Sequence, residues 1–196
     1  MHTHQPMLFV FAGNNGSGKS TLRDLIIDKI GIDINIDPDA MARKLDSEKP
    51  ESKWKSAGIE ALNSFKRYIK EGKDFSNEAT LTSKAAIRQM KEAKEKGYEV
   101  TMFYIALSDV NQNIERVAMR VKNGGHDIPT EVIESRSTTS FEYLYEYAHI
   151  IDNLVLIDNS KGNGEFILEI NNGIITYDIS PLPRWASTVV EKFKKG

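Results

Sequence analysis

The sequence feature that most constrains the fold is a glycine-rich octapeptide, GNNGSGKS, at residues 13–20. It follows a short, continuously apolar run, residues 7–12, and opens a stretch of helical apolar spacing, residues 19–30, which Gly31 ends. The pattern G-x-x-x-x-G-K-[ST] between a strand and a helix is typical of a turn whose backbone N–H groups enclose a phosphate chain. The octapeptide therefore predicts a nucleoside triphosphate on this turn.

Each part of the octapeptide has an expected role in holding ATP. Glycines let the backbone approach the phosphates, and the start of the following helix adds a partial positive charge. Lys19 is expected to reach the β- and γ-phosphates, and the Ser20 hydroxyl is expected to ligate Mg²⁺. ATP and Mg²⁺ are thus the expected cofactors, and the predicted ATP-binding residues are Gly13, Asn14, Asn15, Gly16, Ser17, Gly18, Lys19, Ser20 and Thr21.

Strand and helix patterns alternate along the rest of the chain. Further strands are predicted at residues 32–36, 75–81, 98–107 and 154–158. Helices are predicted from Pro38, along an apolar face of Ile59, Leu62, Phe65 and Ile69, and over residues 83–96, 110–122 and 130–149. Alternating, largely apolar strands indicate a parallel sheet that is covered on both faces. We therefore predict an α/β chain with the three-layer P-loop NTPase fold and a mainly parallel five-stranded sheet.

The end of the chain has a different pattern. Residues 165–170 and 174–179 flank Asn171-Asn172-Gly173, and Asn and Gly tolerate the positive φ angles of a tight hairpin turn. A C-terminal β-hairpin is therefore predicted, with a short helix after Pro183. No repeat or linker divides the 196 residues, so we expect a single P-loop domain, residues 1–196, with an N-terminal tail (1–6), a helical lid region (115–140) and a hairpin appendix (165–179).

Composition excludes several classes of protein. The 26 Lys+Arg and 28 Asp+Glu give a net charge of −2, so no global basic surface for nucleic acid is expected, although a local patch could exist within a balanced total. The absence of cysteine excludes disulfides, thiolate zinc sites and a cysteine nucleophile. No apolar run approaches the ~20 residues that span a bilayer, and the first residues lack a signal peptide pattern. We expect no membrane partner and a cytoplasmic location.

Missing motifs narrow the class further. The chain has no Asn-Lys-x-Asp guanine motif, no Leu-Ser-Gly-Gly signature and no Asp-Glu dipeptide, which argues against GTPases, ABC ATPases and AAA-type motors. Residues 154–158 imitate a Walker B strand, but Asn159-Ser160 follows, which favours a structural role for Asp158. A small P-loop kinase remains, in which catalysis is mostly positioning and charge neutralisation around the transferred phosphoryl group.

Candidate acceptor-side residues follow the second and third predicted strands. Asp37 and Asp39 stand where ligands bind in a doubly wound sheet, and one of them could deprotonate an acceptor hydroxyl while the other caps a helix. Glu78, two residues before Thr80, could hold Mg²⁺ or a substrate hydroxyl, or be a solvated surface residue.

Arginines around a Gly124-Gly125 pair suggest a lid. Arg116 and Arg120 share a helical face before this pair, and Arg136 follows on the next helix. Cationic side chains on such a segment could stabilise charge on the γ-phosphoryl group opposite Lys19, although ordinary solvated arginines remain the alternative.

Together these motifs resemble the zeta-toxin-like P-loop kinases. The resemblance spans roughly residues 7–160 and is carried by residues 9–21, Asn35–Asp39 with Ala42-Arg43, Asn77–Leu81, Gly97–Val100, Ala106–Ser108, Arg116–Val121, Gly124–Pro129 and Arg136. It implies an ATP-dependent kinase that phosphorylates the 3′-hydroxyl of the sugar in UDP-N-acetylglucosamine, a reaction that starves bacterial wall synthesis and that an antitoxin protein restrains.

The resemblance also assigns roles by position. Asp39 is the implied base and Asp37 supports it, Glu78 and Thr80 contact the sugar nucleotide, and Arg120 meets the γ-phosphate. His126 stands about where a second lid arginine is expected, so Arg136 takes that role and His126 joins the substrate-binding set. The chain also lacks the long C-terminal extension of the best-known toxins. A kinase or ATPase for another small hydroxyl acceptor, or a nucleotide-binding module with little turnover, remains open.

Overall fold

The computed structural model describes residues 4–193, so the first half of the expected tail at residues 1–6 lies outside the described residues. Its strands are β1 (Met7–Ala12), β2 (Asn35–Ile36), β3 (Phe75–Ala79), β4 (Glu99–Ala106), β5 (Asn153–Asp158), β6 (Glu165–Asn171) and β7 (Ile174–Asp178). Its α-helices are α1 (Lys19–Ile30), α2 (Pro38–Leu45), α3 (Trp54–Glu71), α4 (Lys84–Glu95), α5 (Val110–Lys122), α6 (Thr130–Tyr147) and α7 (Arg184–Phe193). Short 3₁₀ turns, η1 (Pro50–Lys53) and η2 (Ala148–Ile150), precede α3 and follow α6.

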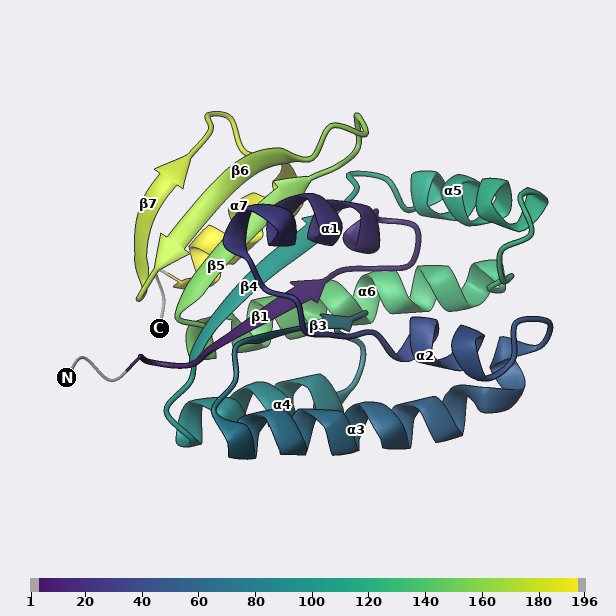
Figure 1. Cartoon of the computed structure of the whole chain (residues 1–196). Helices are drawn as coiled ribbons and strands as arrows, with labels where there is room; N and C mark the ends of the chain where they lie inside the picture. The colour runs from purple at the N-terminus through teal and green to yellow at the C-terminus, as the bar shows by residue number, and fades with distance from the viewer. Residues whose placement is uncertain (1–3, 194–196) are drawn as a thin grey trace.

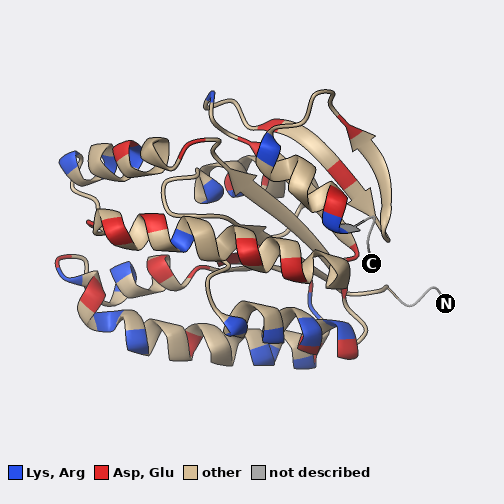
Figure 2. Cartoon of the chain, turned by 180° about the vertical axis from the view of Figure 1, so that it is seen from behind, with Lys and Arg blue, Asp and Glu red and all other residues tan. Residues whose placement is uncertain are grey.

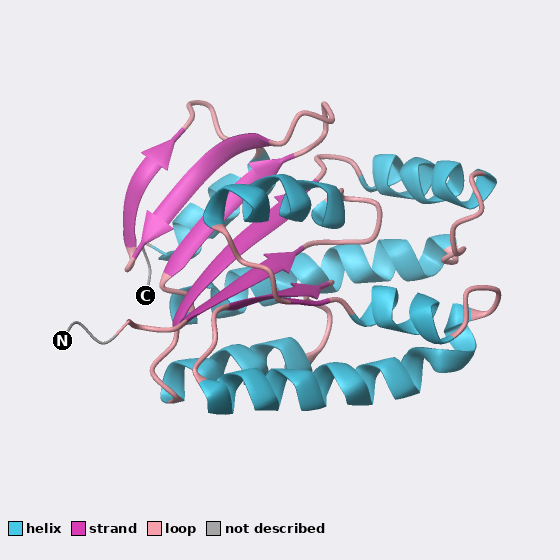
Figure 3. Ribbon diagram, in the orientation of Figure 1, coloured by secondary structure: helices cyan, strands magenta, loops and turns pink. Residues whose placement is uncertain are grey.

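The strands form one seven-stranded sheet in the order β2-β3-β1-β4-β5-β6-β7. The first five strands are parallel, and β6 and β7 continue the sheet in antiparallel pairing. Helix α1 lies on one face, while α3, α4, α6 and α7 lie on the other (Figures 1 and 3). The predicted three-layer P-loop NTPase fold, with five parallel strands and a C-terminal hairpin, is therefore confirmed.

Successive side chains of β1 point to opposite faces of the sheet, and both faces are covered by helices. Leu8 and Val10 point into the larger core under α3, α4, α6 and α7, whereas Phe9 and Phe11 point into the smaller core under α1. Phe11 stacks on Phe103 of β4 with ring centroids 5.0 Å apart. Because β1 buries both of its faces, its sequence is a continuous apolar run.

The predicted second strand and second long helix are both present, but each differs in one detail from the sequence pattern. The second strand was expected over residues 32–36, but β2 contains only Asn35–Ile36, since it is an edge strand whose first residues leave the sheet to pack Ile32 under α1. On α3, Ile59 and Leu62 are 54% and 41% exposed. The buried stripe instead runs through Ala57, Ala61, Phe65 and Ile69, since small residues let α3 lie close to its neighbours.

Basic and acidic residues are concentrated on different helices, although the net charge is only −2. Seen from behind, Lys and Arg gather along α3 and α4, while Asp and Glu predominate on α6 (Figure 2). Lys94 of α4 pairs with Asp152 at 2.6 Å, near the start of β5. Within residues 4–193, no helix is both long and apolar enough to cross a membrane.

Candidate active site

The turn between β1 and α1 forms the phosphate-binding loop at the carboxyl end of the central strand. Gly13 has a φ of +142°, and a side chain there would overlap the carbonyl oxygen of Ile105. Gly16 has a φ of +75°, and a Cβ atom there would lie 2.5 Å from the Asn113 carbonyl oxygen. Both positions therefore require glycine, because strands and helices press directly against this loop.

Two buried asparagines hold the loop from outside. Asn113 of α5 donates through Nδ2 to the carbonyl of Asn15 at 2.8 Å, and Asn159 after β5 donates to the carbonyl of Ser17 at 2.8 Å. Both asparagines are at most 6% exposed. These bonds turn the loop carbonyls outward, which leaves the opposite side of the loop free to present N–H groups to an anion.

Lys19 lies at the base of the main cleft, where its Nζ donates to the Asn14 carbonyl at 3.1 Å. Desolvation by burial lowers the pKa of Lys19, and Arg120 lowers it further, while Glu78, Asp39 and Asp37 oppose the shift. Phosphate oxygens arriving at this position would favour the charged form in the same way as those carboxylates do.

Glu78 at the end of β3 lies beside the loop serine. Its Oε2 accepts a hydrogen bond from Ser20 Oγ at 2.7 Å, and its Oε1 accepts one from Asn35 Nδ2 at 3.3 Å. Burial, and secondarily the charge of Asp37, raise the pKa of Glu78, whereas Ser20, Lys19 and Asn35 pull it down. The carboxylate thus faces the P-loop from the side of the cleft.

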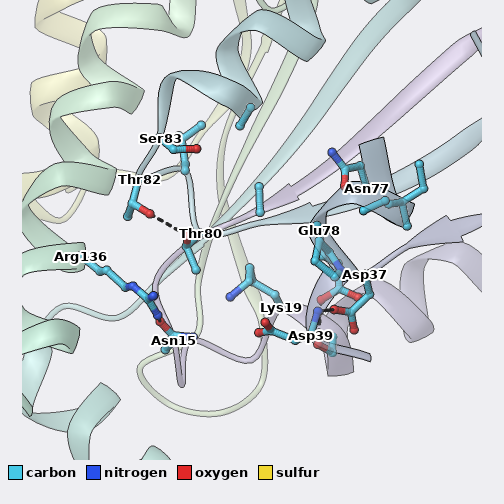
Figure 4. Close-up of a pocket in the computed structure, with 18 of the residues that line it drawn as sticks. Asn15, Lys19, Asp37, Asp39, Asn77, Glu78, Thr80, Thr82, Ser83 and Arg136 are labelled. Atoms are coloured by element: carbon cyan, nitrogen blue, oxygen red, sulfur yellow. Dashed lines mark hydrogen bonds between the residues drawn. The ribbon is translucent and has the colours of Figure 1, made fainter. Parts of the chain in front are cut away.

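The two aspartates after β2 have different surroundings. Asp37 caps α2: its Oδ1 accepts from the backbone N–H groups of Asp39 at 2.9 Å and Ala40 at 3.0 Å, and Arg43 approaches Oδ2 at 3.7 Å. Asp39 extends into the cleft beside Lys19 (Figure 4). Among the described residues, its carboxylate makes no hydrogen bond or ion pair, so it is free to meet a ligand.

The three arginines of the predicted lid region have separate partners. Arg136 donates through Nη1 to Asn15 Oδ1 at 2.8 Å, which brings its guanidinium over the P-loop (Figure 4). Arg120 donates to the carbonyl of His126 at 3.0 Å and lines the cleft. Arg116 donates to the carbonyl of Asn159 at 2.7 Å, so its hydrogen bond holds the segment between β5 and β6.

A cleft of about 610 Å³ brings most of the predicted site residues together. Its lining includes Asn15, Gly16, Gly18, Lys19, Ser20, Thr21, Asp37, Asp39, Glu78, Thr80, Arg120 and Arg136. The Thr80 hydroxyl bonds to that of Thr82 at 2.8 Å, on the α4 side of the cleft (Figure 4). Three further P-loop residues, Gly13, Asn14 and Ser17, are buried behind the loop and do not line the cleft.

A second hollow of about 500 Å³ adjoins the cleft under the lid. His126 lines it and lies edge-on to Trp54 of α3, with ring centroids 5.1 Å apart, and its Nδ1 is 3.6 Å from Glu51 Oε2. The lid therefore reaches across to the start of α3. Arg43 and Asp39 line both hollows, so the two spaces lie next to each other.

Sequence reasoning did not identify the residues that shape the P-loop and the second hollow. Asn113 occupies a position in the apolar stripe of α5, between Val110 and Val117, where a polar residue signals a buried partner. Asn159 follows the strand that imitates Walker B. The carboxylate of that strand, Asp158, accepts from Ser108 Oγ at 3.1 Å and from the Ser160 N–H at 2.8 Å. Asp158 lines neither hollow, in agreement with its predicted structural role.

A glycine-rich loop at the topological centre of a parallel sheet, opposite a free carboxylate and arginines, defines the class of P-loop phosphotransferases. The family model for zeta toxin matches residues 1–166. The chain therefore belongs to the zeta toxin family, and it is an ATP-dependent kinase.

The chain is also similar to individual proteins and solved structures. An uncharacterised protein from Haemophilus influenzae is 38% identical over 126 residues, which are 64% of this chain and 89% of that protein. A chain of the PezAT chromosomal toxin–antitoxin system of Streptococcus pneumoniae has a TM-score of 0.65 and 16% identity, covering 100% of this chain and 88% of that one. The AvrRxo1-ORF1:-ORF2 complex with ATP contains a chain with a TM-score of 0.64 and 16% identity, covering 96% of this chain and 64% of that one. At these identities the two structures show a shared fold.

Proposed function

We propose that the protein transfers the γ-phosphoryl group of ATP to a sugar hydroxyl of a UDP-sugar, such as the 3′-hydroxyl of UDP-N-acetylglucosamine. The free Asp39 carboxylate in the cleft carries this proposal. Because the Asp37 carboxylate is occupied as the cap of α2, Asp39 is the carboxylate available to act as general base.

The proposed step is an in-line displacement. Asp39 accepts the proton of the sugar hydroxyl as that oxygen forms its bond to the γ-phosphorus. The bond from the γ-phosphorus to the β,γ-bridging oxygen breaks, and ADP leaves with the bond electrons. Lys19 and the P-loop N–H groups hold the phosphates, while Arg120 and Arg136 neutralise charge on the transferred group from the lid side.

The loop residues fit a bound Mg²⁺ ion. Ser20 lies at the first turn of α1 with its hydroxyl directed to the cleft side, and hydroxyl and carboxylate oxygens are the hard donors that Mg²⁺ prefers. We propose that Ser20 holds Mg²⁺ on the ATP phosphates, where the ion neutralises phosphate charge.

The acceptor is proposed to occupy the space between the cleft and the second hollow. Thr80 lines the cleft and His126 lines the hollow, so both can contact a sugar nucleotide that reaches Asp39. A proteinaceous antitoxin is the proposed macromolecular partner, by analogy with the toxin–antitoxin system of the S. pneumoniae relative.

Asp39→Asn tests the proposal. The purified chain is incubated with ATP, Mg²⁺ and a panel of UDP-sugars, and the products are separated by anion-exchange chromatography with mass spectrometry. We expect a phosphorylated UDP-sugar from the wild type and none above background from Asp39→Asn. Asp33→Asn, at an exposed position before β2, is the matched control and retains the wild-type rate.

An acceptor-independent release of phosphate that no UDP-sugar changes would contradict the sugar-nucleotide assignment. The same incubation with a broad metabolite extract then reveals a different hydroxyl acceptor. Tight ATP binding with negligible turnover across both panels would instead indicate a nucleotide-binding module.

A further inference from the structure

We propose that Glu78 is a ligand of the nucleotide's Mg²⁺ ion, so that Glu78 and Ser20 together form the protein's share of the metal site. This inference rests on the proposed use of Mg²⁺ with ATP, but not on which acceptor is phosphorylated. It gives Glu78 a different role from the contact with the sugar nucleotide that the family resemblance implies.

The spacing of the two oxygens supports a shared ion. Ser20 Oγ and Glu78 Oε2 lie 2.7 Å apart. Neighbouring ligands of an octahedral Mg²⁺ ion with bonds of about 2.0–2.1 Å are about 2.9 Å apart, so the pair needs little adjustment to bind one ion or its bound water. The Asn35 amide holds the other carboxylate oxygen at 3.3 Å and so fixes the orientation of the carboxylate.

The negative charge of Glu78 also favours a bound cation at this position. A P-loop serine lies beside the β- and γ-phosphates, and a carboxylate hydrogen-bonded to that serine therefore lies close to several phosphate oxygens. Two like charges about 4 Å apart repel by roughly 1–4 kcal/mol at effective dielectric constants of about 80 to 20. A divalent cation between the carboxylate and the phosphates converts this repulsion into attraction, whereas a carboxylate without one would oppose ATP binding.

Among the described residues, two further acids near the P-loop are already engaged by other partners. P-loop NTPases usually add an acidic side chain to the P-loop hydroxyl, commonly from a Walker B strand. Here Asp158, at the end of the Walker B-like strand, bonds to Ser108 and Ser160 and lines neither hollow. Asp37 is engaged by the N-terminus of α2.

Protein side chains would supply only a few of the ligands of the Mg²⁺ ion. Within residues 4–193, no group of three or more His, Asp or Glu side chains is arranged to hold a metal alone. The ion would therefore depend on phosphate oxygens for further ligands, as Mg²⁺ in nucleotide sites generally does. Metal and nucleotide are expected to bind together, so the effect of Mg²⁺ on the affinity for the nucleotide is the quantity to measure.

The test measures how much Mg²⁺ tightens nucleotide binding when no acceptor is present. A non-hydrolysable ATP analogue, AMPPNP, is titrated into the full chain by calorimetry with excess MgCl₂ and, separately, with EDTA. We expect Glu78→Gln to reduce the Mg²⁺-dependent gain in affinity by roughly 10–100-fold. In EDTA, its affinity for AMPPNP equals or exceeds that of the wild type, because a repelling charge is gone.

Mn²⁺ supplies a direct readout of the metal. The amplitude of the free Mn²⁺ signal in electron paramagnetic resonance, measured with AMPPNP and protein present, reports how much ion is bound. Glu78→Gln should leave more Mn²⁺ free than the wild type, and Glu78→Asp, which keeps the carboxylate, should recover part of the binding. Glu78→Asp also tests the inference if the glutamine variant does not fold.

Two controls separate a metal role from other roles. Asp39→Asn removes a carboxylate from the same cleft and is expected to keep the Mg²⁺-dependent gain, as is Glu95→Gln on the exposed end of α4. A gain in Glu78→Gln within about threefold of the wild type, or an equal loss in Asp39→Asn, overturns the inference. Because no acceptor is present, this result is independent of the UDP-sugar experiment.

Discussion

At the scale of single residues, the P-loop depends on side chains that lie outside its own motif. Asn113→Leu keeps the size of the side chain but leaves the Asn15 carbonyl without its 2.8 Å donor. A buried acceptor that loses its partner costs about 1–3 kcal/mol, so we expect a loss of unfolding free energy of that order and weaker AMPPNP binding. Urea denaturation and calorimetry measure the two effects.

Asn111→Leu is the matched control, because Asn111 lies on the exposed side of the same helix. It should change the unfolding free energy by no more than about 0.5 kcal/mol. Equal stability of Asn113→Leu and the control would show that the Asn15 carbonyl has found another donor, and would contradict the view that Asn113 holds the loop.

The same residues show what sequence could and could not predict. The spacing of Lys19 and Ser20 identified the loop, because phosphate binding there depends on a local motif. Which aspartate is free could not be read from the sequence, because Asp37 and Asp39 both suit the first turn of a helix and only their hydrogen bonds separate them. The role of Asn159 could not be predicted from the sequence. One of its partners, the Ser17 carbonyl, is far from it in the chain, and the other, the Gly164 N–H, belongs to no recognisable motif.

At the scale of elements, the predicted lid region (115–140) is joined to the P-loop through both of its helices and to α3 at its tip. Asn113 of α5 and Arg136 of α6 both bond to Asn15, so the two helices are joined to the P-loop. The tip reaches α3 through the edge-on contact of His126 with Trp54. Any opening of residues 122–129 is therefore expected to break the contact of His126 with Trp54.

Trp54→Ala tests this arrangement of the lid. Removing the indole takes away the aromatic surface under His126, so we expect residues 122–129 to be cleaved faster by trypsin at Lys122 under native conditions. The thermal midpoint should change little, because Trp54 is 47% exposed. Ile59→Ala, at another exposed position on α3, is the control. An unchanged cleavage rate would show that other contacts hold the lid.

Element order was predictable because strands buried on both faces leave long apolar runs, and glycines mark most helix ends. Gly31 and Gly72, for example, adopt left-handed conformations after α1 and α3. The buried face of α3 was not predictable in the same way. Large apolar residues suggested Ile59 and Leu62, but close packing favours Ala57 and Ala61, and Leu62 instead lines the cleft.

At the scale of the whole molecule, the C-terminal hairpin is part of the main sheet. The hairpin turn could be predicted from Asn172 and Gly173, which have φ angles of 49° and 79° in the structure. The pairing of β6 with β5 could not be predicted, because long-range contacts decide which strands are neighbours. Ile167, Leu168 and Ile170 of β6 share the larger core with Ala186 and Val189 of α7, which supports the proposal that residues 1–196 form one domain.

This continuity predicts that the hairpin stabilises the nucleotide site as well as its own strands. Leu168 is fully buried opposite Leu156 of β5, the strand that leads to Asn159 and thus to the P-loop. Leu168→Ala is expected to lower the unfolding free energy by about 2–5 kcal/mol.

In urea, AMPPNP binding and the far-ultraviolet circular dichroism signal of Leu168→Ala should be lost in one transition, because one cooperative core carries both signals. Ile174→Ala, at a position that is 67% exposed on the same hairpin, should stay within about 0.5 kcal/mol of the wild type. Two separated transitions in Leu168→Ala, with binding retained after the hairpin unfolds, would instead show that β6, β7 and α7 form an independent unit.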